Sequence, residues 1–214
     1  MNGRREPIFN APWPPVAMAG AIVGLYAWQS LAPLELVVDR FGFSPAKFAA
    51  GDWAGAVTAL FVHGTWMHGL LNAAFALAFG APVARFLGGS GRGLAAFFTF
   101  YLGCGVLANL GHAAVHPGDP TSLVGASGAV AGLMGAAARL IATRGARLGT
   151  LTSPPVISMT LALLIVNLLL AVFGAPGSGG MRIAWEAHLF GFAAGLLGIG
   201  PITRLFGAPG RLDD

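Results

Sequence analysis

Charged residues are the scarcest feature of this 214-residue chain. Only 9% of its residues are Asp, Glu, Lys or Arg, whereas 56% are apolar and the mean hydropathy is +0.74. A soluble domain carries about a quarter charged residues, so this composition excludes an ordinary soluble domain. The single cysteine excludes an intramolecular disulfide and a thiolate metal cluster. The net charge of +4 does not indicate a nucleic-acid partner, because the basic residues are scattered between apolar runs.

Six stretches without any charged residue divide the chain. They cover residues 7–34, 53–84, 93–118, 120–138, 148–181 and 187–203. Because a membrane-spanning helix needs roughly 20 apolar residues, each stretch holds one span and none comfortably holds two. We therefore predict an all-α membrane protein with six spanning helices, at about residues 15–33, 57–80, 94–113, 123–142, 155–174 and 185–203.

The positions of Lys and Arg predict the orientation of these helices. Nine of them lie in the two terminal segments and the second and fourth loops, and three lie in the first, third and fifth loops. Positive residues concentrate on the cytoplasmic side, so both termini are expected in the cytoplasm. Residues 1–14 would form a cytoplasmic N-terminal segment, 15–204 one six-helix domain, and 205–214 a cytoplasmic C-terminal tail. The irregular first loop, about residues 34–56, mixes bulky apolar residues with charges and is expected at the membrane interface.

Polar residues inside the predicted spans are candidates for function, because a polar group in hydrocarbon is costly. Ser127 lies near the outer start of the fourth span, within Gly125-Ala126-Ser127-Gly128. A lone serine in such a run of small residues is usually a packing residue. Ser127 shares one face of the predicted helix with Ala131 and Gly135.

His188 lies near the outer start of the sixth span, on one face with Gly191 and Gly195. Faces of small residues allow two helices to approach closely. If the faces of the fourth and sixth spans meet, the imidazole of His188 lies within reach of the Ser127 hydroxyl. Such a pair activates a weak hydroxyl nucleophile.

The second span supplies His68 and Asn72, which lie four residues apart and therefore share a face. They are either interhelical hydrogen-bonding residues or a pair of donors for a developing oxyanion. His63 lies about 180° from Asn72 on the same predicted helix, so a structural role in tethering the first loop is favoured. Because the second, fourth and sixth spans run in the same direction, His68, Asn72, Ser127 and His188 are expected at a similar depth.

Other intramembrane chemistries fit the sequence less well. The spans contain no His-Glu-x-x-His motif and no pair of aspartates, which excludes the usual zinc and aspartyl proteases. A zinc site made by His63, His68 and His188 is possible by ligand type, but the direction of His63 argues against it. His112 and His116 have no carboxylate at metal-ligand spacing and are interpreted as solvated loop residues. We therefore expect no metal.

Taken together, these residues resemble the rhomboid family of intramembrane serine proteases. The resemblance covers roughly residues 35–200, and the residues that carry it are His63, His68, Asn72, Gly125, Ala126, Ser127, Gly128, His188, Gly191 and Gly195. It implies a six-transmembrane-helix rhomboid-like bundle with an interfacial first loop. Ser127 would be the nucleophile and His188 the general base, with His68 and Asn72 assisting the oxyanion. His63, Gly125, Gly128, Gly191 and Gly195 would be structural residues near the site.

The resemblance also implies a function and a location. The activity would be that of a serine endopeptidase that cleaves transmembrane segments of membrane proteins near the outer face, without a cofactor. The expected location is a bacterial cytoplasmic (inner) membrane, and the expected partners are membrane-protein substrates and the lipid bilayer, with no nucleic acid. An alternative function is that of a non-proteolytic rhomboid-like protein that binds and guides membrane helices. A transporter fits less well, because the sequence lacks ionisable residues at mid-membrane positions.

Two positions depart from the family pattern. The family often carries Tyr or Phe four residues after the serine, where it stacks on the catalytic imidazole, and this chain has Ala131. In the first loop, the family often has Arg after Trp, and here Ala54 follows Trp53. Glu186 lies about 200° around the helix from His188, so the expectation is a Ser-His dyad without a carboxylate.

Overall fold

The computed structural model describes residues 11–174 and 183–209, and within them the chain is built from helices. The helices are α1 (Trp13–Gln29), α2 (Leu34–Phe41), α3 (Pro45–Ala49), α4 (Gly55–Thr58), α5 (Trp66–Leu87), α6 (Gly91–Val115), α7 (Ser127–Ile141), α8 (Pro154–Phe173) and α9 (Trp185–Phe206), with a short 3-10 helix η1 (Ala59–Phe61). The six longest lie at the six predicted spans. Parts of the two predicted terminal segments, residues 1–10 and 210–214, lie outside the described residues.

Four of the described helices, α5, α6, α8 and α9, are long and apolar enough to cross a membrane. Helix α7 is apolar but has only 15 residues, and α1 has 17. Helix α8 contributes just three buried residues, so most of its apolar surface faces outward, as expected for a helix in contact with lipid. The chain is therefore an integral membrane protein with an all-helical fold.

The second predicted span begins nine residues too early. Residues 55–61 form α4 and η1, and α5 starts only at Trp66. The start is fixed by Thr65, whose side chain accepts a hydrogen bond from the backbone N–H of His68 at 3.2 Å. Hydropathy alone does not detect this boundary, because the residues before the cap are as apolar as those after it. His63 therefore precedes the helix instead of belonging to it.

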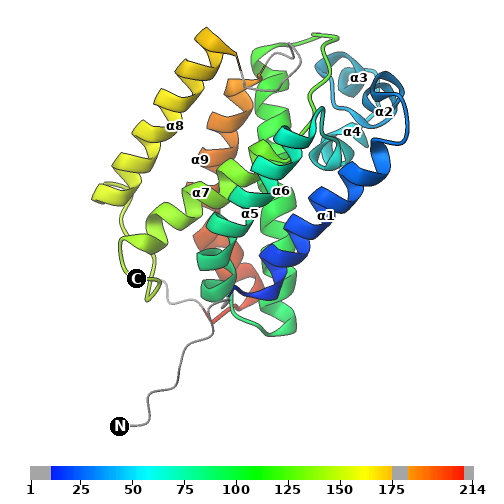
Figure 1. The fold of residues 1–214 in the computed structure, drawn as a ribbon. Coiled ribbons are helices and arrows are strands. Elements are labelled where there is room, and N and C mark those ends of the chain that lie inside the picture. The colour runs from blue at the N-terminus through cyan, green and yellow to red at the C-terminus, as the bar shows by residue number, and fades with distance from the viewer. Residues whose placement is uncertain (1–10, 175–182, 210–214) are drawn as a thin grey trace.

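Helix α7 lies at the centre of the bundle, and α8 stands at its outer edge (Figure 1). Helix α7 contacts α5, α6, α8 and α9, and its contact with α9 is the most extensive between any two of the described helices. The short helices α2, α3 and α4 gather at the end of the bundle where α9 begins (Figure 1). Helix α1 begins and helix α9 ends at the opposite end of the bundle (Figure 1).

Glycines bring α7 and α9 into backbone contact. A Cβ atom on Gly195 would lie 1.8 Å from the carbonyl oxygen of Gly132, and one on Gly191 would lie 2.1 Å from that of Gly128. These distances leave no room for any side chain. The predicted meeting of two small-residue faces is thus observed, and the expected Gly135 takes part, because its Cβ would lie 2.3 Å from the carbonyl oxygen of Phe192. The closest contacts, however, are made by Gly128 and Gly132 instead of the expected Ala131, which lies in a buried cluster with Leu163 and Phe192.

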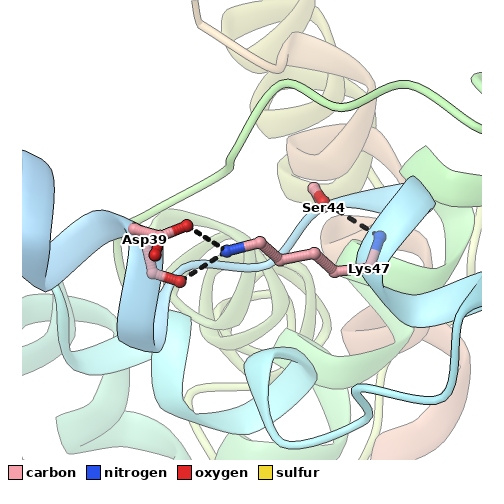
Figure 2. Close-up of polar contacts among 3 residues, drawn as sticks. All are labelled: Asp39, Ser44 and Lys47. Atoms are coloured by element: carbon pink, nitrogen blue, oxygen red, sulfur yellow. Dashed lines mark hydrogen bonds and ion pairs between the residues drawn. The ribbon is translucent and has the colours of Figure 1, made fainter.

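The first loop is held by its own polar contacts (Figure 2). The Lys47 ammonium donates hydrogen bonds to the Asp39 backbone oxygen at 2.5 Å and to its carboxylate at 2.6 Å. The hydrogen bond to the carboxylate and the positive charge of Lys47 hold the pKa of Asp39 below its usual range. The Ser44 side chain caps α3 by accepting from the backbone N–H of Lys47 at 3.2 Å.

The same loop is attached to the chain that leads into α7. Phe43 and Leu123 exchange two backbone hydrogen bonds, of 3.0 and 2.6 Å, in an isolated antiparallel bridge. The backbone N–H of Gly125 donates to the Ala59 carbonyl at 2.9 Å. These bonds fix the path of the residues immediately before Ser127, the first residue of α7.

We expect Gly195→Ala to disrupt the bundle, because its methyl group would force the α7 and α9 backbones apart. Overpacking of a filled interface usually costs about 1–3 kcal/mol, and a clash with backbone should lie at or above the top of that range. The matched control is Gly198→Ala on the same helix, whose Cβ would meet only a ring atom of Phe100 at 3.7 Å. The melting temperature in detergent should fall strongly for the first variant and little for the second. Equal melting temperatures would contradict the glycine contact.

Candidate active site

Ser127 and His188 form a direct pair. The Ser127 hydroxyl oxygen lies 2.8 Å from Nε2 of His188. Ser127 begins α7 and His188 lies in the first turn of α9, so both side chains sit at the same end of the bundle. The backbone contact between Gly128 and Gly191 lies immediately beside them and sets the short distance.

Asn167 of α8 contacts the other nitrogen of the same imidazole. The Asn167 side-chain oxygen lies 2.7 Å from Nδ1 of His188, and Asn167 is only 4% exposed. An amide oxygen can only accept, so Nδ1 carries the proton and Nε2 presents its lone pair to the serine hydroxyl. The Ser127 O–H therefore donates to His188, which is the arrangement that a general base requires.

Asn167 is not among the site residues predicted from the sequence. A usable signal existed, because it is the one polar residue in the apolar run from Leu161 to Phe173. A side-chain amide in such a run is costly unless it is paired, which makes it a candidate for function. Periodicity within one helix, however, does not reveal that α8 brings this amide to α9.

Glu186 does not reach the Ser127–His188 pair. Its carboxylate oxygen Oε1 lies 3.1 Å from Nε2 of His116, and its other oxygen lies 3.8 Å from Nδ1 of His112. The interpretation as a solvated loop residue is therefore wrong for His112, which lies within α6 and is 6% exposed. His116 does follow the helix, and its side chain is 37% exposed, but it too contacts the Glu186 carboxylate.

His68 and Asn72 lie against the segment that precedes Ser127. A Cβ atom on Gly125 would lie 2.6 Å from Nε2 of His68 and 3.7 Å from Nδ2 of Asn72. Gly125 also has φ of +118°, a conformation that side chains rarely adopt. Two independent constraints therefore require glycine here, and its lack of a side chain lets both polar groups approach the backbone beside the serine.

His63 lies beside this segment as well. Its Nε2 atom accepts a hydrogen bond from the backbone N–H of Ala126 at 3.3 Å, and its own backbone is bonded to the Gln29 side-chain amide of α1. The ring packs edge-on against His68, with centroids 5.0 Å apart. The expectation that His63 points about 180° away from Asn72 assumed that both residues lie on one helix, but α5 starts only at Trp66 and His63 precedes it. The residue connects α1 to the chain entering α7.

No metal-ligand group is formed by His63, His68 and His188 in the part of the chain that the structure describes. Cys104 is buried and packs α6 against α7. A Cβ atom on Gly132 would lie 2.4 Å from the Cβ atom of Cys104. The polar side chains around the start of α7 are thus the Ser127–His188 pair, Asn167 behind the imidazole, and His63, His68 and Asn72 beside Gly125 and Ala126.

Comparison with known proteins identifies the family of the chain. A family model described as Rhomboid domain matches residues 50–204, which is most of the chain. A protein of Bacillus subtilis (strain 168), named "Putative rhomboid protease YdcA", is 30% identical over 149 residues, covering 70% of this chain and 67% of that protein. Both findings confirm the resemblance drawn from the sequence. The chain belongs to the rhomboid family.

Proposed function

We propose that this chain is an intramembrane serine endopeptidase that cleaves transmembrane segments of membrane proteins. The observation that carries the proposal is the 2.8 Å contact between the Ser127 hydroxyl and Nε2 of His188. Membership of the rhomboid family supports it, as does the relative named a rhomboid protease. A protein that only bound and guided helices would need neither the hydroxyl nor the oriented imidazole.

In the proposed reaction, Ser127 attacks the carbonyl carbon of the scissile peptide bond while its proton passes to Nε2 of His188. The tetrahedral intermediate collapses, the C–N bond breaks, and His188 gives its proton to the leaving amine. Water then attacks the acyl-enzyme in the same way, with His188 again accepting and returning the proton. The catalytic pair is a dyad in the sense that no carboxylate takes part.

His68 and Asn72 are proposed to stabilise the oxyanion. Both carry N–H donors, and both lie against Gly125, two residues before the nucleophile. Negative charge develops on the carbonyl oxygen only as Ser127 attacks, so donors placed beside it lower the barrier to reaction more than they strengthen substrate binding.

Asn167 is proposed to be the positioning residue of the general base. It fixes the tautomer of His188 and the rotation of its ring by accepting from Nδ1 at 2.7 Å. An amide stabilises the imidazolium less than a carboxylate does, but it can be buried among apolar residues without a charge. This contact supplies the orientation that a stacked aromatic ring would supply at position 131, where this chain has alanine.

The depth of the site suits hydrolysis of membrane segments. Ser127 is the first residue of α7 and His188 the fourth of α9, so the pair lies within about 5 Å of the helix ends. Water can reach such a depth from one face of the membrane. The substrate must still unwind locally, because its helical hydrogen bonds shield the peptide group. Segments rich in small, helix-weakening residues near the outer face are therefore the proposed substrates.

The proposed topology places residues 1–14 and 205–214 in the cytoplasm of a bacterial cell and the six-helix domain, 15–204, in its cytoplasmic membrane. The asymmetry of Lys and Arg between alternate loops supports this orientation. Six spans, one for each of the six longest described helices, would return the chain to the side on which it started.

We expect Ser127→Ala and His188→Ala each to reduce cleavage of a generic transmembrane substrate to background in detergent. The double variant should be no slower than either single variant, because the two residues act as a unit. A fluorophosphonate probe should label the wild type at Ser127 and leave both single variants unlabelled. Substantial proteolysis by folded Ser127→Ala would refute the proposal, and folded wild type that neither cleaves nor reacts would favour the helix-guiding function.

Asn72→Ala and His68→Ala should lower kcat by about 10²–10³, the usual cost of losing one oxyanion donor, with little change in KM. Single-turnover cleavage and melting temperature should be measured on both. Loss of activity only in proportion to loss of the folded state would mean that the two residues are interhelical hydrogen-bonding partners. The oxyanion would then have to be held by backbone N–H groups near Ser127.

Asn167→Leu should lower kcat by about 10- to 150-fold at nearly constant KM. That range corresponds to the loss of a hydrogen bond of about 1.5–3 kcal/mol to a group that becomes charged. Asn167→Asp keeps an acceptor for Nδ1 and should recover activity that Asn167→Leu does not. If Asn167→Leu turns over at the wild-type rate in folded protein, the amide is a packing residue.

The orientation can be tested with cysteine substitutions and a membrane-impermeant thiol reagent on intact cells, in a Cys104→Ala background. A cysteine at Ser90, between α5 and α6, should be protected, and one at Thr121, between α6 and α7, should be labelled. The opposite result would reverse the proposed topology and place the site on the cytoplasmic side.

A further inference from the structure

A second cluster of functional side chains lies at the same end of the bundle, separate from the Ser127–His188 pair. It consists of His112 and His116, one helical turn apart at the end of α6, and Glu186 in the first turn of α9. Each contributes one atom able to bind a metal ion, and these three atoms all lie within 4.8 Å of one another. We infer that His112, His116 and Glu186 form a binding site for a transition-metal ion, with Zn²⁺ as the best fit.

The type of donor points to zinc. Two imidazole nitrogens and one carboxylate oxygen, with water in the fourth position, form a common tetrahedral zinc environment. Two histidines four residues apart along a helical turn project from the same face and can hold one ion together. Ca²⁺ and Mg²⁺ prefer a shell of oxygen ligands, which this cluster does not supply.

The distances fit an ion with small side-chain movements. Atoms bound to a tetrahedral zinc at about 2.0–2.1 Å lie roughly 3.4 Å from each other. Nε2 of His116 is 3.1 Å from Oε1 of Glu186, and Nδ1 of His112 is 3.8 Å from Oε2. Because the three donor atoms lie within 4.8 Å of one another, rotation of the partly exposed His116 ring and of the carboxylate would bring them around one centre.

The state of His112 gives an independent reason to expect a ligand. The residue is 6% exposed, and its Nδ1 atom is buried without a hydrogen-bond partner among the described residues. A buried nitrogen without a partner is unfavourable, and it faces the Glu186 carboxylate beyond hydrogen-bond distance. A metal ion between them would satisfy the nitrogen and the carboxylate together.

The surroundings also favour a cation. Asp119 follows α6 and brings a second carboxylate near the two histidines. The hydrogen bond from the Thr121 backbone N–H, 2.8 Å long, is the main reason why the pKa of Asp119 lies below its usual range. The side chain of His116 is 37% exposed, so an ion has a path from the aqueous side.

Such an ion would connect the end of α6 to the start of α9. Glu186 lies two residues before His188, and the two side chains leave α9 in different directions, one to the cluster and one to Ser127. The site is therefore expected to stabilise the first turn of the helix that carries the catalytic histidine. Its existence does not depend on the proposed protease activity.

The test uses the full-length protein, purified without a polyhistidine tag and stripped with a chelator. Zn²⁺ is titrated against a chromophoric competitor, and Co²⁺ is added separately to record its visible spectrum. We expect one Zn²⁺ per chain, a melting temperature that rises with Zn²⁺, and the intense absorption of tetrahedral Co²⁺. His116→Gln and Glu186→Gln should each weaken Zn²⁺ binding by about 100-fold or more. Residues that only hydrogen-bond to metal ligands already contribute about 10- to 100-fold to metal affinity, so loss of a ligand itself should cost at least as much.

Two control variants distinguish binding at this cluster from binding elsewhere in the chain. Glu35→Gln removes an equal charge from the exposed helix α2 and should leave Zn²⁺ binding unchanged. His188→Ala should also retain the bound ion, whereas its loss would place the ion at the catalytic pair and overturn the inference. Binding that is absent, or equally strong in His116→Gln and the wild type, would show that the cluster is only an ion pair between α6 and α9.

Discussion

The backbone contact between α7 and α9 is the feature on which the rest of the candidate site depends. Gly128 and Gly132 on one helix face Gly191 and Gly195 on the other, and a single methyl group at Gly195 would meet a carbonyl oxygen at 1.8 Å. In a membrane, helix association relies on close packing because lipid is as apolar as the side chains. Helices kept at an ordinary separation by larger side chains would hold the serine and the imidazole too far apart to share a proton.

A second set of contacts prepares the segment that enters α7. The first loop is bonded to Leu123 and Gly125, and His63 accepts from the N–H of Ala126. Gly125 takes a backbone conformation with positive φ, which turns the chain next to His68 and Asn72. Ser127 therefore follows a short stretch in which several residues are fixed by partners from other parts of the chain. The proposed reaction would require such preorganisation, because its transition state develops charge.

The imidazole is oriented by α8, a helix that buries few of its residues. Asn167 is one of only three residues that α8 buries, and its side chain is bonded to His188. In a chain with the family's aromatic residue four positions after the serine, that ring would orient the histidine from α7 itself. In this chain, alanine occupies that position and packs against Leu163 and Phe192, while the amide acts from the neighbouring helix. Movement of α8 relative to the bundle would therefore change the geometry of His188, the proposed general base.

Much of this protein could be predicted from its amino-acid sequence. The scarcity of charge indicated a membrane protein. The charge-free stretches located both ends of five of the six long helices to within a few residues, and α5 is the exception. The spacing of Ser127, His188, His68 and Asn72 indicated which residues belong near one site, because helical periodicity fixes which side chains share a face. Tertiary structure decided the remainder. The start of α5 depends on the Thr65 cap, which moved His63 out of the helix and next to Ala126. The partners of Asn167 and Glu186 lie on other helices, and periodicity within one helix carries no information about which side chain of a different helix will meet it.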